Sequence, residues 1–168
     1  MEILFETERI AFIRPNTIYA EDYLRNMNNP VIYDFIANEH EEDYTLEQEI
    51  DWVNRHQEDN TFTMIDRNTR EFIGNCGFNE IENSIGTIGI MIDPNFQNVG
   101  LGTEAITFLI NYGFNMLNLD EIRLIVFSHN QRAIRCYRRL GFKEYQRIEN
   151  VCQRDGNEIA DIYMRLIR

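Results

Sequence analysis

The sequence predicts an α/β domain built on a mixed sheet, and three observations lead to this prediction. Segments typical of strands and helices follow one another in the order β, α, α, β, β, β, α, β, α, β, β. An isoleucine-rich strand at 85–92 is followed, after a turn at Pro94, by a helix whose start carries two glycines. No repeat, low-complexity segment or linker divides the 168 residues, so we expect one domain spanning 1–168. Interspersed strands and helices of this kind are typical of helices packed on a mixed sheet.

The first third of the chain is predicted to contain one strand followed by helices. We expect a strand at 9–14, helices at 18–27 and 46–57, and a short helical segment at 31–36. Pro15 ends the strand, because a proline offers no N–H to a sheet. Thr17 is the predicted N-cap of the helix that follows. Thr45, with Gln48 three residues later, forms a capping-box pattern at the start of the next helix.

The remaining two thirds contain most of the predicted strands. We expect strands at 61–65, 71–78, 85–92, 122–127, 142–148 and 159–166, and helices at 101–116 and 130–140. The first of these helices has one buried face, because apolar side chains recur at 3.6-residue spacing from Leu101 to Met116. The second ends at Gly141, the residue type that most often follows a helix. A turn at 155–157 (D-G-N) joins the last two strands.

Composition and charge argue against several functional classes. The net charge of −12 argues against nucleic acid as a partner, because backbone phosphates are bound by stripes of Lys and Arg. The three cysteines are far apart and form no C-x-x-C pair, which indicates neither a metal site nor a disulfide framework and favours a reducing cytoplasm. We identify no signal peptide and no apolar run near the roughly 20 residues that span a bilayer. We therefore expect a cytoplasmic protein without membrane, nucleic-acid or metal partners.

The segment 86–112 carries the clearest functional signal. Pro94 ends the strand, and Q-N-V-G-L-G at 97–102 precedes the helix. A helix N-terminus has unpaired N–H groups and partial positive charge, and Gly100 and Gly102 let an anion approach the main chain closely. The joint is therefore a candidate phosphate cradle. It is neither a Walker loop, since no Gly-Lys-Ser/Thr follows, nor a dinucleotide fingerprint, since Ala105 stands where a third glycine is needed.

Two motifs resemble the acetyl-CoA motifs of the GCN5-related N-acetyltransferase (GNAT) family. The Q-x-x-G-x-G pattern at 97–102 is similar to the family's pyrophosphate loop, and N-x-x-A-x-x-x-Y-x-x-x-G-F at 130–142 is similar to its second motif. The closing segment 149–166 resembles the last hairpin of a subgroup that holds bacterial spermidine/spermine N-acetyltransferases and ribosomal-protein N-terminal acetyltransferases. The resemblance extends from Arg9 to Leu166.

This resemblance implies a fold and a cosubstrate. The implied sheet is mixed and mostly antiparallel, with about seven strands, a splay between strands four and five, and about four flanking helices. The implied cosubstrate is acetyl-CoA, from which the acetyl group would pass directly to a primary amine without an acetyl-cysteine intermediate. The implied acetyl-CoA-binding residues are Ile90, Met91, Ile92, Gln97, Asn98, Val99, Gly100, Leu101, Gly102, Thr103, Asn130, Ala133 and Tyr137.

Tyr137 and Glu80 are the candidate catalytic residues. Tyr137 is either a core aromatic of its helix or the proton donor to the CoA thiolate. A phenol with a pKa near ~10 is protonated at neutral pH and can donate to the thiolate of a thiol near ~8.5. Glu80, at a strand end beside the central strand, is either the acceptor of the substrate's proton or a solvated carboxylate. We interpret His129 as a surface residue of the turn before a helix.

The resemblance also implies an acceptor groove, whose candidate substrate-binding residues are Tyr33, Glu39, Glu41 and Glu80. The acidic loop at 38–44 favours a small cationic amine such as a polyamine. Two alternatives stay open: the α-amine of a protein N-terminus, and a non-catalytic acyl-CoA-binding module. We also expect a homo-oligomer, a dimer or larger.

Overall fold

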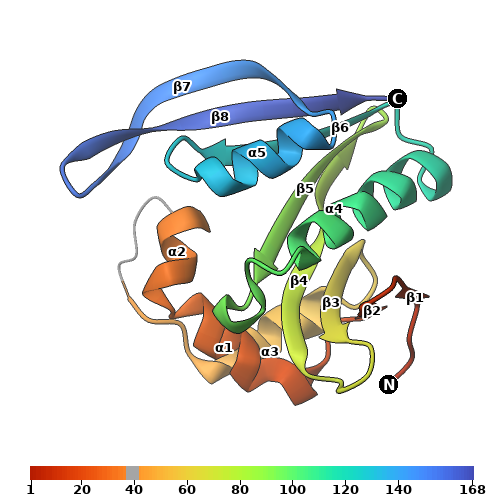
Figure 1. Ribbon diagram of the computed structural model, residues 1–168. Coiled ribbons are helices and arrows are strands. Elements are labelled where there is room, and N and C mark those ends of the chain that lie inside the picture. The colour runs from red at the N-terminus through yellow and green to blue at the C-terminus, as the bar shows by residue number, and fades with distance from the viewer. Residues whose placement is uncertain (37–41) are drawn as a thin grey trace.

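The structure is a computed structural model that describes residues 1–36 and 42–168. Eight strands form one sheet in the order β1-β2-β3-β4-β5-β6-β8-β7 (Figure 1). Neighbouring strands are antiparallel except β5 and β6, which are parallel, so the predicted mixed and mostly antiparallel sheet is confirmed. The strands are β1 Phe5–Glu6, β2 Ile10–Ile13, β3 Thr61–Asp66, β4 Phe72–Glu82, β5 Ile85–Ile92, β6 Glu121–Phe127, β7 Lys143–Arg154 and β8 Asn157–Ile167.

The described residues contain one strand more than the seven predicted, and each of the five α-helices lies at a predicted helical segment, against the implied count of about four. The extra strand is β1, which pairs Phe5 and Glu6 with β2 and is too short to show a period-2 pattern. The predicted short helical segment at 31–36 is the helix α2. The α-helices are α1 Ala20–Met27, α2 Pro30–Ile36, α3 Leu46–Arg55, α4 Leu101–Asn111 and α5 Gln131–Arg139. In the described part of the chain, no helix combines the length and apolar character that crossing a membrane requires.

The two predicted N-caps of the N-terminal region have different outcomes. The capping box of α3 is confirmed: Thr45 Oγ1 accepts from the Gln48 N–H at 3.3 Å, and Gln48 Oε1 accepts from the Thr45 N–H at 2.8 Å. Thr17 is not a cap, because the chain enters α1 through a 3₁₀ turn at Thr17–Tyr19. Asn16 caps that turn, its side chain accepting from the Ile18 N–H at 3.0 Å.

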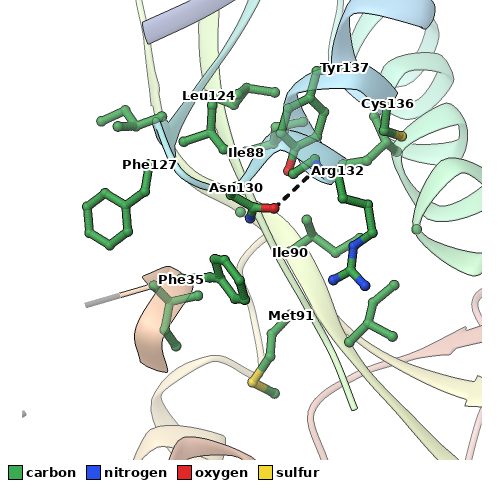
Figure 2. Close-up of a pocket in the computed structure, with 18 of the residues that line it drawn as sticks. Phe35, Ile88, Ile90, Met91, Leu124, Phe127, Asn130, Arg132, Cys136 and Tyr137 are labelled. Atoms are coloured by element: carbon green, nitrogen blue, oxygen red, sulfur yellow. Dashed lines mark hydrogen bonds between the residues drawn. The ribbon is translucent and has the colours of Figure 1, made fainter. Parts of the chain in front are cut away.

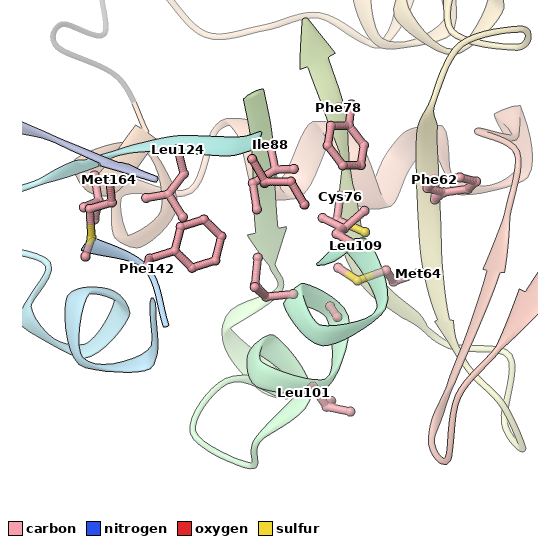
Figure 3. Packing of buried hydrophobic residues seen from close by; sticks show 14 of the residues in the cluster. Phe62, Met64, Cys76, Phe78, Ile88, Leu101, Leu109, Leu124, Phe142 and Met164 are labelled. Carbon is pink, nitrogen blue, oxygen red and sulfur yellow. The ribbon is translucent and has the colours of Figure 1, made fainter. Parts of the chain in front are cut away.

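The core lies on both faces of the sheet, and β2 shows why. Its residues alternate between two clusters: Phe12 packs with α4, and Ile13 packs with Tyr23 of α1 and Val53 of α3. Figure 3 shows Leu109 of α4 lying against the strands of the first cluster. All four residues of β2 are therefore buried, which gives the strand a continuous apolar pattern instead of an alternating one.

The apolar face predicted along 101–116 ends early. α4 passes into a π-helical turn at Tyr112–Met116, in which each turn holds more residues than an α-turn. The 3.6-residue spacing is lost there, and Met116 is 59% exposed. Gly113 and Leu119 remain buried where the turn descends toward β6.

Candidate active site

The site is a cavity that opens where β5 and β6 separate. The two strands pair over three residues each, Ile85 to Thr87 with Glu121 to Arg123. β5 stays paired with β4 as far as Ile92, so the main-chain groups of residues 88–92 that face β6 have no strand partner among the described residues. A cavity of about 790 Å³ lies in this gap. It can accept an extended molecule that lies along β5 as an added strand would.

One end of the cavity is the loop and helix start after β5. Gln97, Asn98, Gly100, Gly102 and Thr103 line it. Gly100 is the N-cap of α4 and has a φ of +88°, a conformation that favours glycine. The first-turn N–H groups of α4 have no intrahelical acceptor, so the main chain presents donors and partial positive charge to this end. The arrangement suits a phosphate group.

A buried carboxylate holds the start of this loop. Asp93 is 2% exposed, accepts hydrogen bonds from Arg25 and Asn26 of α1 at 2.9 Å each, and caps the Asn95 N–H at 2.9 Å. Burial by itself raises the pKa of Asp93, but these donors outweigh it and hold the pKa below its usual range. The loop is therefore tied to α1 on the side away from α5.

An arginine of α5 faces the same end. Arg132 donates to Asn98 Oδ1 at 2.8 Å and to Gln97 Oε1 at 2.9 Å, and both Arg132 and Arg139 line the cavity. Figure 2 shows the Arg132 guanidinium on the side of the cavity nearest α4. The Arg132 cation and a helix N-terminus thus converge on this end, which fits a pyrophosphate or another phosphate-bearing group.

Tyr137 and Asn130 line the middle of the cavity, both from the α5 region. Asn130 caps α5 by accepting from the Ala133 N–H at 3.2 Å (Figure 2). Burial, with a smaller contribution from Cys136, raises the pKa of Tyr137 above its ordinary value, so the phenol keeps its proton at neutral pH. Its hydroxyl has no hydrogen-bond partner among residues 1–36 and 42–168, which leaves its proton available to a bound molecule.

Glu80 does not line the cavity, so of its two predicted roles the structure supports the solvated carboxylate and not the proton acceptor. The β4–β5 register shifts between Phe78 and Glu80, which inserts Asn79 as an extra residue. Asn79 lines the cavity, and its side chain lies over Gly89 of β5, where a Cβ would come within 2.8 Å of Nδ2. Glu80 is exposed opposite Thr87. A bulge changes which face of the sheet the residues after it point to, and no sequence pattern around Asn79 predicts it.

The opposite end of the cavity is apolar and comes from α2, β6 and β8. It is lined by Ile32, Phe35, Ile36, Ile125, Phe127 and Asp161. Tyr33 is half-buried outside this lining, and Glu39 and Glu41 fall outside the described residues. Sequence reasoning did not select Phe35, Phe127 or Asp161. A lone acidic residue between the buried Ala160 and Ile162 was the available signal for Asp161.

Ionic contacts tie α2 to the elements beside it. Asp34 accepts from Arg154 Nε of β7 at 2.7 Å and lies 3.3 Å from His129 Nε2. The His129 ring stacks with Phe35 and Phe127 at centroid distances of 5.0 and 5.8 Å. His129 lies in the predicted turn before α5, but its side chain is half-buried, 23% exposed, and not fully at the surface. These contacts position Phe35 at the apolar end.

The predicted acetyl-CoA-binding residues mostly meet at this cavity. The exceptions are Leu101, which is buried in the core beneath the loop, and Val99, which is exposed and directs its main-chain oxygen to Arg9 Nη1 at 2.7 Å. The predicted residues that line the cavity are Ile90, Met91, Ile92, Gln97, Asn98, Gly100, Gly102, Thr103, Asn130, Ala133 and Tyr137.

This fold and cavity define an acetyltransferase domain, and comparison with known proteins gives the same result. Residues 9–143 match the acetyltransferase (GNAT) domain family, so the chain belongs to that family. The GNAT fold uses acetyl-CoA, and the glycine-opened loop and Arg132 fit its phosphates. The predicted family resemblance and cosubstrate are thereby confirmed.

Two sequence relatives and one solved structure are similar to this chain. The chain is 36% identical over 107 residues to the uncharacterised N-acetyltransferase p20 of Bacillus licheniformis, covering 62% of this chain and 60% of the relative. It is 47% identical over 53 residues to the spermidine N(1)-acetyltransferase of Escherichia coli, covering 32% of this chain and 28% of that protein. The chain thus spans less than two thirds of these relatives. A spermidine N-acetyltransferase of Vibrio cholerae, solved with CoA and spermine, has the same fold, with a TM-score of 0.84, 22% identity and 96% of each chain covered.

Proposed function

We propose that the protein is an acetyl-CoA-dependent N-acetyltransferase that moves an acetyl group directly to a primary amine. The observation that carries this proposal is the slot between β5 and β6, which has a phosphate cradle at one end and the protonated Tyr137 beside it. An extended thioester lying along β5 would meet the main-chain N–H groups of this strand that face away from β4, and such an N–H can donate to its carbonyl oxygen. We therefore propose that the amine attacks the bound thioester directly, without an acetyl-cysteine intermediate.

The proton transfers that the reaction requires give Tyr137 the role of general acid. The acceptor nitrogen forms a bond to the acetyl carbon as the carbon–sulfur bond breaks, and the sulfur leaves as a thiolate. Tyr137 donates its proton to that thiolate, which is basic enough to take it, since a thiol has a pKa near ~8.5. The attacking amine loses its own proton to water. Tyr137 recovers a proton from solvent after the thiol departs.

The proposed acceptor is a small cationic amine such as a polyamine. The net charge of −12, the exposed Glu42 and Asp43 beside α2, and the similarity to a spermidine acetyltransferase support it. The three cysteines are free, which supports a reducing compartment such as the cytoplasm. One domain over residues 1–168 and a homo-oligomer remain parts of the same proposal.

The acceptor class is testable by steady-state kinetics. Thiol release from acetyl-CoA should be fastest with spermidine or putrescine and slow with a neutral N-terminal peptide. The KM for spermidine should rise with added salt, because the attraction is electrostatic. Preference for the peptide would favour the protein N-terminal acetyltransferase alternative. Acetyl-CoA binding without thiol release for any amine would favour the non-catalytic module.

Replacing Arg132 by glutamine should raise the KM for acetyl-CoA about tenfold or more, because a charge-assisted contact to the phosphates is lost. The KM for the amine should stay near its wild-type value. Arg135→Gln is the matched control, since Arg135 is exposed on the same helix and does not line the cavity. Equal effects of the two changes would mean that the helix acts through its overall charge and not through Arg132.

A further inference from the structure

The cavity has two chemically different ends. Arg132 stands at the phosphate end, together with the N-terminus of α4, and Arg139 lines the cavity further along α5. Phe35 and Phe127 stand on the other side, as Figure 2 shows. Among the described residues that line the cavity, Asp161 is the one acidic side chain. Charge is therefore separated along the cavity, with a cation where an anionic cosubstrate fits and one carboxylate at the apolar end.

The sheet register places Asp161 at that apolar end. On β8 it lies directly opposite Phe127 of β6 and Ile148 of β7. Its neighbour Ile162 belongs to the core cluster that packs with α4 and α5, so alternation directs Asp161 to the other face. Phe127 shares that face, and the pair forms one wall of the apolar end. No core requirement explains an acidic residue at this position.

Asp161 has no partner in the described part of the chain. Its side chain makes no ion pair or hydrogen bond there. The guanidinium of Arg154, which lies over the Phe127 ring at 5.9 Å, is engaged by Asp34 on α2. Burial raises the pKa of Asp161, because its surroundings disfavour the unpaired carboxylate. A bound cation would relieve that cost.

We propose that Asp161 binds a cationic ammonium group of the acceptor amine and is a specificity-determining residue of this enzyme. The inference rests on the proposed acetyltransferase function. A carboxylate supplies the charge for an ammonium, and the rings of Phe127 and Phe35 supply apolar surface for the methylene groups that carry it. The cosubstrate occupies the opposite, basic end, so both molecules can be bound at once.

Binding of spermidine to the CoA-saturated protein tests this assignment without requiring turnover. Asp161→Asn should weaken spermidine binding about 10- to 100-fold in a calorimetric titration and leave the acetyl-CoA Kd unchanged. Asp161→Glu should retain most of the affinity, because it keeps the charge. Glu158→Gln is the matched control: it removes one negative charge from the exposed part of the same strand, paired with Gln153 outside the cavity lining.

Each outcome has one meaning. Loss of affinity in Asp161→Asn alone, with an unchanged acetyl-CoA Kd, supports the assignment. Equal weakening by Glu158→Gln would show that overall charge accounts for the effect, and unchanged binding in Asp161→Asn would overturn the proposal directly. A wild-type protein that transfers acetyl groups but binds no cationic amine would also overturn it while leaving the acetyltransferase function in place. Failure of the wild type to release thiol from acetyl-CoA with any amine would instead contradict the function itself.

Discussion

Replacing Tyr137 by phenylalanine is expected to lower kcat by about 10²- to 10⁴-fold while the affinity for acetyl-CoA stays nearly unchanged. The substitution removes the proton donor and keeps the ring that packs edge-on against Phe142 at 6.0 Å. Burial raises the pKa of Tyr137, so the wild-type phenol stays protonated as pH rises through the neutral range. Its proton is lost only above the ordinary phenol pKa near ~10, and donation should persist up to that pH.

Tyr145→Phe is the matched control for this experiment. Tyr145 is a half-buried phenol on β7, against the guanidinium groups of Arg123 and Arg165 and outside the cavity lining. Its change should leave kcat within about twofold of wild type, as expected of a surface substitution. The measurement is thiol release at saturating acetyl-CoA and amine, together with acetyl-CoA binding by calorimetry. Wild-type turnover in Tyr137→Phe would reduce Tyr137 to a packing residue.

Replacing Gly100 by valine is expected to abolish acetyl-CoA binding. Gly100 has a φ of +88°, a conformation strongly unfavourable for a β-branched residue, and its added Cβ would lie 3.3 Å from Arg9 Nη2. The main chain must change conformation to accept valine, and this moves the N–H groups that face the phosphate end. A branched side chain also stands where the anion approaches the backbone.

Gly156→Val is the control that separates the loss of acetyl-CoA binding from the loss of stability that a strained backbone causes. Gly156 also has a left-handed φ, +78°, but nothing lies within 4 Å of its added Cβ, and it belongs to the β7–β8 turn. Both variants should lose stability, measured as a lower Tm, and Gly100→Val alone should lose acetyl-CoA binding in calorimetry. A folded Gly100→Val protein with wild-type acetyl-CoA affinity would exclude the backbone cradle as the phosphate site.

The parts of the fold that were predictable carry their signal locally. The strand at Ile85–Ile92 was predicted with its observed limits, because an apolar run ends at a proline turn. The capping box at Thr45 was predicted because both partners lie within four residues. β1 was missed because its two residues form a strand through pairing with β2 alone. The exposure of Met116 was missed because π-helical turns have no known sequence mark.

The site residues also divide into those that a local motif predicts and those that depend on long-range strand pairing. Residues 97–103 and Tyr137 were found because each belongs to a motif within one loop or helix. Asn79 and Asp161 were missed because long-range pairing decides which strand residues face the cavity. Because of a single bulge, Asn79 lines the cavity and Glu80 does not. Asp161 reaches Phe127 through a register that joins residues 34 positions apart, and no periodicity in the sequence specifies it.

The incomplete pairing of β5 and β6 also bears on how the protein avoids aggregation. An unpaired strand edge can recruit other chains, and the outer edges of this sheet are protected against it. β1 is two residues long, and β7 is bulged and carries Lys143, Glu144, Arg147 and Glu149. The isoleucine-rich edge of β5 has no such protection of its own, but it lies inside a cavity between α2, α4 and α5. Such a recessed edge excludes a second polypeptide by its surroundings and stays open to a single narrow chain molecule.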